Sequence, residues 1–161
     1  SGNLVAQQNE IELLRLLYKN NSESNKDLNA LRNHMVGSSE FSPFELEDAI
    51  IQRKASKAIK IIHTLKKADN TSGPLLVWIV SKITSLTYLA SKDSNPQVFL
   101  KNNGIWQSKM NDYLSFLKKQ TVNDLDLIQK DVYELELSLK GLRKKDFWLG
   151  LESLICKLAS N

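Results

Sequence analysis

The fold class is decided by the stretch Gly73-Pro74-Leu75-Leu76-Val77-Trp78-Ile79-Val80 near the middle of the chain. An apolar run of this length is also typical of a buried strand. Ile83, Leu86 and Leu89 follow it at helical spacing, however, and the Gly-Pro start suits a helix because proline is favoured at the first helical position. We therefore predict a mostly buried central helix of about 17 residues that ends near Ser91.

Helical patterns continue on both sides of this central helix. The predicted helices cover residues 4–18, 26–35, 56–67, 96–100, 105–118 and 123–140, with one more helix after Pro43 and a last one capped by Asp146. Gly141 follows the helix predicted over 123–140 and is a suitable helix stop. Because no segment alternates with a period of two for long enough to predict a strand, the predicted fold class is all-α.

The best-specified helix start lies in the segment Phe41-Ser42-Pro43-Phe44-Glu45-Leu46. Its serine is a favourable cap, its proline occupies the first helical position, and its glutamate follows the cap by three residues, which is the pattern of a capping box. The outer phenylalanine and leucine are spaced to form a hydrophobic staple. The preceding Gly37-Ser38-Ser39 carries no periodic apolar pattern and is the predicted domain boundary.

The composition is that of an ordinary globular protein. The chain has 161 residues, of which 42% are hydrophobic and 25% are charged, and this allows one or two small domains with a real core. A net charge of +4 at pH 7 permits contact with nucleic acid without requiring it. The apolar run 75–80 is far too short to cross a bilayer, and the first residues lack the order of a signal peptide. We expect a cytoplasmic protein with no membrane partner.

Cys156 is the only cysteine of the chain. An intrachain disulfide is therefore excluded, and a reducing compartment fits this composition. Its sequence neighbours Leu154 and Ile155 are apolar, as are Leu151 and Leu158. This surrounding predicts a buried structural thiol rather than a reactive one, which would need an exposed and electropositive site.

The sequence carries no pattern for catalysis or for cofactor binding. It lacks a Gly-rich phosphate loop followed by Lys and Ser/Thr, which disfavours NTP hydrolysis. His34 and His63 are far apart, and neither has a second ligand at helical spacing. The acidic residues Glu45, Glu47 and Asp48 are explained by the positive end of a helix dipole. An enzyme is the least favoured interpretation, and we predict no catalytic residue, cofactor or metal ion.

Two groups of basic residues remain as candidates for function. The first group precedes the last predicted helix and consists of Lys140, Arg143, Lys144 and Lys145. The second group belongs to the helix predicted over 56–67 and its start, and it consists of Arg53, Lys54, Lys57 and Lys60. Of these, Arg53, Lys57 and Lys60 are expected on the side opposite the apolar one. Each group is either a solvated face or a surface for phosphate contacts, which are independent of sequence and sensitive to salt.

Several segments resemble one protein family through their order and spacing. They are Gly2-Asn3-Leu4 with Glu10-Ile11-Glu12-Leu13-Leu14, Phe41-Ser42-Pro43-Phe44 with Asp48-Ala49 and residues 58–65, Ile105-Trp106-Gln107, Glu136-Leu137 with Leu139-Lys140, and Trp148 with Leu151-Glu152. Together they resemble the C-terminal half of the δ subunit of the bacterial DNA polymerase III clamp loader. The resemblance covers essentially the whole chain.

This resemblance implies an architecture and a set of partners. Residues 1–39 would be the end of a small helical lid domain of the AAA+ type, and residues 40–161 would be the helical collar domain. The collar would assemble with the δ′ and τ/γ subunits, so that the complex loads the β sliding clamp onto primer-template DNA during chromosome replication. The clamp itself would be contacted only through an N-terminal domain that this chain lacks.

The resemblance also bears on catalysis and on the basic loop. By resemblance, δ is a non-catalytic subunit of a DNA-directed DNA polymerase holoenzyme, in the replisome at the nucleoid. Some family members place an aromatic residue in the loop before the last helix, where this chain has Arg143, Lys144 and Lys145. Base stacking is therefore not expected from this loop, whereas phosphate contact remains an option. The alternative is a free-standing basic helical module that binds nucleic acid or a protein adaptor.

Overall fold

The computed structural model describes residues 41–68 and 70–160, and all regular structure in these ranges is helical. The elements are α3 (Glu45–Ile51), α4 (Ala55–Ala68), the short 3-10 helix η1 (Asn70–Ser72), α5 (Gly73–Lys92), α6 (Pro96–Asn102), α7 (Gln107–Lys118), α8 (Val122–Leu139) and α9 (Phe147–Ala159). The predicted all-α class is confirmed for these ranges. The helices predicted over 4–18 and 26–35, the boundary at 37–39, the lid domain over 1–39 and His34 lie outside the described residues.

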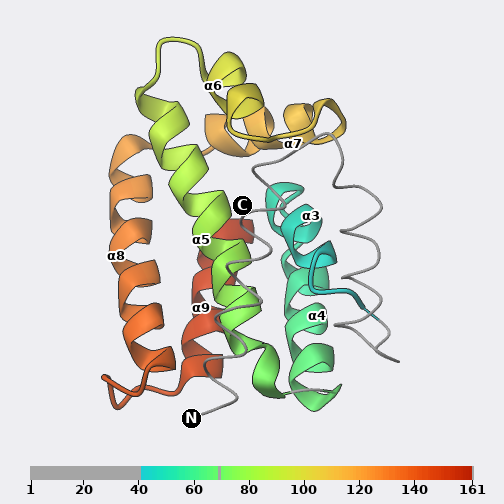
Figure 1. The fold of residues 1–161 in the computed structure, drawn as a ribbon, viewed down its shortest axis with the longest axis vertical. Helices are drawn as coiled ribbons and strands as arrows, with labels where there is room; N and C mark the ends of the chain where they lie inside the picture. Colours follow the sequence, from blue (N-terminus) through green and yellow to red (C-terminus); the bar gives the residue numbers. More distant parts are fainter. Residues whose placement is uncertain (1–40, 69, 161) are drawn as a thin grey trace.

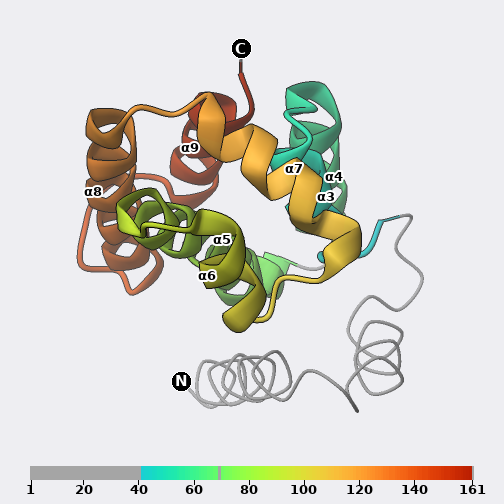
Figure 2. The same ribbon diagram turned by 90° about the horizontal axis from the view of Figure 1, so that it is seen from above.

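Four helices form the body of the described part. Helices α4, α5, α8 and α9 lie along the long axis and alternate in direction, with α3 beside the upper part of α4 (Figure 1). Helices α6 and α7 cover one end of this bundle. Viewed from above that end, α6 lies over α5 and α7 crosses toward α3 (Figure 2). The loop of residues 140–146 and the last turn of α4 lie at the opposite end, which we call the loop end.

Side-chain caps set several helix starts. Asn95 accepts a hydrogen bond from the Val98 amide (3.2 Å) to start α6, and Asp146 accepts one from the Leu149 amide (2.9 Å) to start α9. A full capping box between Thr121 and Asp124 starts α8. Asp146 was predicted as a cap and is confirmed. These contacts satisfy amide groups that the first helical turn leaves without a partner.

Only half of the predicted capping box at Ser42 forms, and Phe44 rather than Ser42 directly precedes α3 as its N-cap. The Ser42 amide donates to the Glu45 carboxylate across 2.7 Å, as predicted, but the Ser42 hydroxyl accepts from the amide of Phe44 (3.3 Å) rather than from that of Glu45. The Glu45 amide instead donates to the Ser42 carbonyl oxygen at 3.0 Å. The chain therefore makes one turn at Pro43 and Phe44 before α3 begins at Glu45.

The core is continuous across α3 to α9 and is centred on α5. Leu76, Ile79, Val80 and Ile83 are fully buried, which confirms the predicted central helix. Leu89 departs from the prediction, because its side chain is 49% exposed near the end of α5. The core also contains a set of buried side chains from other helices that includes Leu46, Ile50, Ile61, Ile62, Tyr113, Phe116, Leu151 and Ile155.

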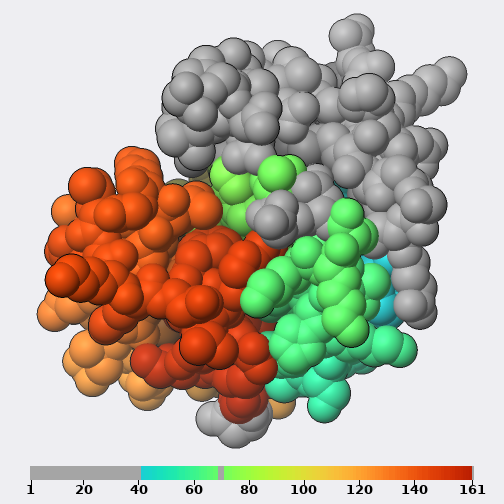
Figure 3. Space-filling model, turned by 90° about the horizontal axis from the view of Figure 1, so that it is seen from below, coloured from blue at the N-terminus to red at the C-terminus, as the bar shows by residue number. Residues whose placement is uncertain are grey.

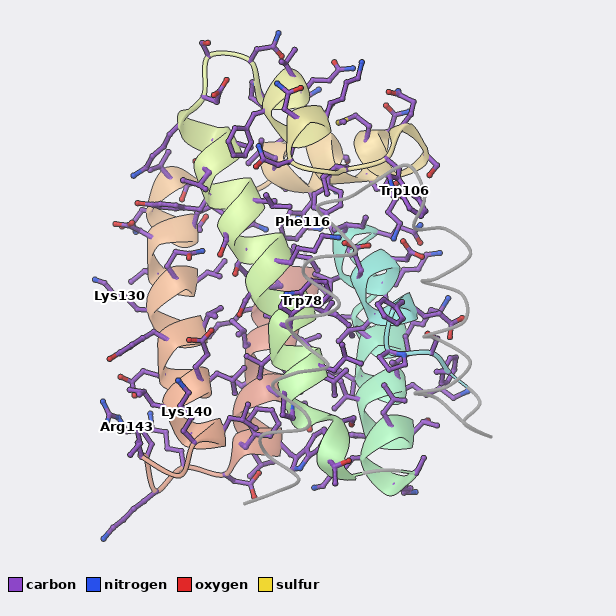
Figure 4. All side chains as sticks on the ribbon, viewed as in Figure 1. Trp78, Trp106, Phe116, Lys130, Lys140 and Arg143 are labelled. Atoms are coloured by element: carbon purple, nitrogen blue, oxygen red, sulfur yellow. The ribbon has the colours of Figure 1, made fainter. Side chains whose placement is uncertain are left out.

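Helix α5 is also the one described helix that is long and apolar enough to span a membrane, and 67% of its most apolar stretch is buried inside the bundle. The burial of this stretch accounts for its composition, since a core helix with several helical neighbours is apolar on most sides. Figure 4 shows Trp78, from this helix, at the centre of the bundle.

The prediction for Cys156 is wrong, because its thiol is free and exposed on α9. The buried residues of this helix are Leu151, Leu154, Ile155 and Leu158. Adjacent residues on a helix point about 100° apart, so Cys156 can follow Ile155 in sequence and still face solvent.

Candidate nucleic-acid interface

The predicted basic loop joins α8 to α9 and lies at the loop end of the bundle. Lys140, Arg143, Lys144 and Lys145 are all exposed, and Figure 4 shows Lys140 and Arg143 at the lower end of α8. Asp146 ends the loop as the cap of α9. The structure thus brings the four predicted residues together on one short segment that both neighbouring helices anchor.

The geometry of the first loop residues is fixed by the way α8 ends. The Leu142 amide donates a hydrogen bond to the Leu137 carbonyl oxygen (2.9 Å), and the Gly141 amide donates one to the Ser138 carbonyl oxygen (3.1 Å). Gly141 has φ +76°, the left-handed conformation that this type of helix ending requires. The predicted stop at Gly141 is confirmed, and it turns the chain away from the helix axis immediately after Lys140.

Arg143 differs from the three lysines of the loop. Its guanidinium donates from Nε to Oε2 of Glu134 (2.9 Å) and from Nη2 to Oε1 (3.4 Å), so it turns back onto α8. The hydrogen bond to Glu134 raises the pKa of Arg143, and the group is cationic at every relevant pH. Arg143 is therefore exposed like the three lysines, but its guanidinium is paired with an acidic side chain.

The second basic group does not form the single helical face that was predicted. Arg53 lies between α3 and α4 with φ +60°, and its Nη2 donates to the Ser160 carbonyl at 2.7 Å. It therefore ties the turn after α3 to the end of α9 and does not belong to the surface of α4. Lys54, Lys57 and Lys60 are exposed, as predicted. Lys60 lies over the ring of Phe41, 5.7 Å from its centroid.

An open pocket of about 430 Å³ lies between α8 and α9 next to the basic loop. Its lining residues are Asp131, Glu134, Leu135, Ser138, Lys145, Asp146, Leu149, Gly150, Ser153, Leu154 and Lys157. Lys157 bridges to Asp131 across it at 3.0 Å. Opposite charges therefore face one another around an apolar floor, and this arrangement selects no particular ligand.

The sequence interpretation missed a buried ionic cluster. Glu47 is 2% exposed, and its carboxylate accepts hydrogen bonds from Lys82 (2.6 Å), Lys109 and the hydroxyl of Tyr113 (2.7 Å). Lys109 also reaches Asp48 at 3.2 Å. Glu47 was predicted only as a partner of the helix dipole. The cluster instead joins α3, α5 and α7, and no sequence signal links these residues because they come from three separate helices.

The electrostatics of this cluster favour the charged carboxylate. Burial alone would raise the pKa of Glu47, but the attraction of Lys82 and Lys109 and their hydrogen bonds outweigh it and lower the pKa to about 2. Burial lowers the pKa of Lys82, although Glu47 opposes this effect. Burial would also lower the pKa of Lys109. The attraction of Glu47 and Asp48 outweighs this effect and raises the pKa of Lys109. A buried carboxylate with this many partners is a structural element of the fold.

Residues 41–68 and 70–160 contain no group of three His, Cys, Asp or Glu side chains that lie close enough together to hold a metal ion. His63 lies on the surface of α4, with Nε2 at 3.2 Å from Oε2 of Glu152 on α9. No protein-family model, curated protein or solved structure matches this chain.

Proposed function

We propose that this chain is the non-catalytic C-terminal region of a clamp-loader δ subunit, and that residues 40–161 form its collar domain. The observation that carries the proposal is the helical bundle itself, with an anchored basic loop exposed at one end. It is supported by the ordered segments of the sequence that resemble this family. The collar would join δ′ and τ/γ, and its loop end would face primer-template DNA in the assembled complex.

Exposed apolar residues suggest where such a collar would meet its neighbours. On α8, Val122 is 57% exposed, Leu127 is 50% exposed and Tyr133 is 59% exposed. The outer face of α8 points away from the bundle, as the side chain of Lys130 shows in Figure 4. Aromatic and aliphatic residues that a domain does not bury itself are typical of the core of a protein interface. We assign this face to a contact with δ′ or τ/γ.

A capture experiment tests the proposal. The tagged chain should retain δ′ and τ/γ from a mixture of purified subunits and should not retain the β sliding clamp. Leu127→Glu should weaken capture at least tenfold if α8 forms the contact, because it places a charge in an apolar interface. Val98→Glu is the matched control, since Val98 is also about half exposed, at 48%, but lies on a different helix, α6.

The outcomes separate the alternatives. If Leu127→Glu does not change the capture, the interface lies elsewhere than on α8, but the assembly with δ′ and τ/γ is still supported. Retention of the clamp would count against the assigned domains. A chain that binds neither δ′ nor τ/γ would favour the free-standing helical module.

A further inference from the structure

We infer that Lys66 and Lys67 of α4 belong to the same cationic surface as Lys140, Lys144 and Lys145, and that this surface binds the backbone phosphates of duplex DNA. Arg143 is then a positioning residue for the loop and not a phosphate ligand. The inference rests on the proposed function, which puts primer-template DNA in front of the loop end. It adds a second element, α4, that the sequence did not connect with the loop.

The end of α4 lies beside the start of α9, which directly follows the α8–α9 loop. The Nζ atom of Lys66 lies over the ring of Trp148, 5.7 Å from its centroid. At Gly73, the first residue of α5, a β-carbon would lie 3.0 Å from the ring of Phe147 and 3.1 Å from Leu139. Figure 3, which views the molecule from below, shows α4 and the segment around residues 140–150 side by side on one face.

The charge on this surface has little internal compensation among the described residues. Lys67, Lys140, Lys144 and Lys145 are exposed, and no ion pair joins any of them to an acidic side chain of residues 41–68 or 70–160. Glu134, which lies near the loop, is already paired with Arg143. Several like charges on one end of a domain repel one another, and a polyanion relieves that repulsion.

The chemistry of these side chains selects phosphate rather than bases. Lysine ammonium groups are compact, strongly hydrated charges on flexible stems, which suits contacts with phosphate oxygens that do not depend on base sequence. The nearby aromatic residues offer no free stacking platform, because Phe147 and Trp148 are half-buried and pack edge-to-face at 5.2 Å. The expected ligand is therefore the backbone of a duplex, bound without base readout.

Arg143 has a different role because both oxygens of Glu134 already hold its guanidinium. This double contact spans nine positions, from α8 to the loop, and fixes where Lys144 and Lys145 emerge. Removing Arg143 should loosen the loop without removing a phosphate contact. Removing a loop lysine, in contrast, should remove one phosphate contact.

The test measures binding of the full chain to a fluorescent primer-template duplex by anisotropy, over a series of salt concentrations. Each phosphate contact adds about 0.9 to the slope of log affinity against log salt. Lys66→Ala with Lys67→Ala should flatten the slope by about 1.8, and Lys144→Ala with Lys145→Ala by the same amount. Arg143→Ala should lower affinity and leave the slope unchanged. Lys54→Ala with Lys57→Ala, two exposed lysines near the other end of α4, is the matched control and should change neither quantity.

Each contrary result overturns a stated part of the inference. If the slope is unchanged in the Lys66/Lys67 variant but flattened in the loop variant, α4 does not belong to the phosphate-binding surface. The proposed function is not affected by that result. No measurable binding of the wild-type chain at low salt, or equal flattening by the control, would overturn the phosphate surface altogether. Tighter binding to anionic lipid vesicles than to the duplex would overturn DNA as the ligand. Assembly with δ′ and τ/γ is measured separately, so its failure would count against the proposed function alone.

Discussion

The hydroxyl of Tyr113 on α7 donates a hydrogen bond to the carboxylate of Glu47 on α3 across 2.7 Å. These two residues are 66 positions apart, and Lys82 of α5 binds the same carboxylate oxygen. One buried charge therefore holds three helices at the end of the bundle that is opposite to the basic loop. The two ends of the domain have separate tasks in our account: the cluster maintains the fold, and the loop end binds a partner.

Replacing Glu47 tests the cluster directly. Glu47→Gln should destabilise the chain by about 3–5 kcal/mol at neutral pH, because it leaves two buried ammonium groups without their shared counter-charge. Chemical denaturation followed by circular dichroism measures this change. Asp48→Asn is the matched control at the adjacent acid, which is partly exposed and paired with Lys109, and it should cost less than about 1 kcal/mol. Equal effects of the two substitutions would show that Glu47 has no special role.

The same carboxylate predicts an acid-sensitive stability. Its pKa is lowered from 4.5 to about 2 on folding, so the unfolded state binds a proton more readily at low pH. The stabilisation of about 3 kcal/mol is fully present above pH 4.5 and is lost as pH falls from there to about 2. The gap in unfolding free energy between wild type and Glu47→Gln should close over this range. A gap that stays constant down to pH 2 would contradict the assignment.

Tyr113→Phe isolates one hydrogen bond of the cluster. The substitution keeps the buried ring and removes the hydroxyl that donates to a charged acceptor, and we expect a loss of about 1.5–3 kcal/mol. Tyr133→Phe serves as the control, because Tyr133 is 59% exposed on α8 and its change should stay within about 0.5 kcal/mol. Urea unfolding of both variants provides the comparison, and a neutral Tyr113→Phe would show that Lys82 and Lys109 satisfy Glu47 without it.

Gly73→Ala tests the contact between α5 and the ends of the basic loop. A β-carbon there would approach Phe147 and Leu139 at 3.0 and 3.1 Å, so these side chains must shift. We expect a loss of about 1–3 kcal/mol, as for other overpacked sites. Gly150→Ala is the comparison, since only Leu135 lies near, at 3.3 Å, and the gain in helix propensity of up to about 1 kcal/mol offsets the crowding. Thermal unfolding of both variants measures the two effects. If Gly73→Ala proved as stable as Gly150→Ala, the contact at Gly73 would not be as tight as the structure shows.

The boundary predicted at residues 37–39 also has a direct test. The core of the described part runs from Phe44 to Leu158 without a break, so a fragment of residues 40–161 should fold on its own. Its thermal unfolding should be a single cooperative transition with a helical circular dichroism spectrum. A gradual, non-cooperative loss of signal would mean that earlier residues are needed for the fold.

Local sequence patterns predicted the helices well because local chemistry determines where helices start and stop. The Gly73-Pro74 start, the Asp146 cap and the Gly141 stop each depend on a few adjacent residues, and all three are confirmed. The apolar stripe of α4 was equally clear, since its buried residues recur at helical spacing.

What the sequence did not reveal depends on contacts between distant segments. Glu47 was explained by its own helix, whereas its burial depends on Lys82 and Lys109 from two other helices. Arg53 was assigned to a helix face, but its side chain binds the carbonyl of Ser160 instead. At the candidate site, the loop lysines were predicted correctly as exposed, but the Arg143–Glu134 pair and the approach of Lys66 to Trp148 could not be inferred from sequence spacing.

The most direct test of the central claim is size-exclusion chromatography with light scattering on a mixture of this chain, δ′ and τ/γ. We predict one complex that contains the chain together with both partners, because the collar is proposed to join δ′ and τ/γ in one assembly. The result that would contradict the account is a δ′–τ/γ complex that forms without it, while the chain elutes alone at its own mass of 18.3 kDa.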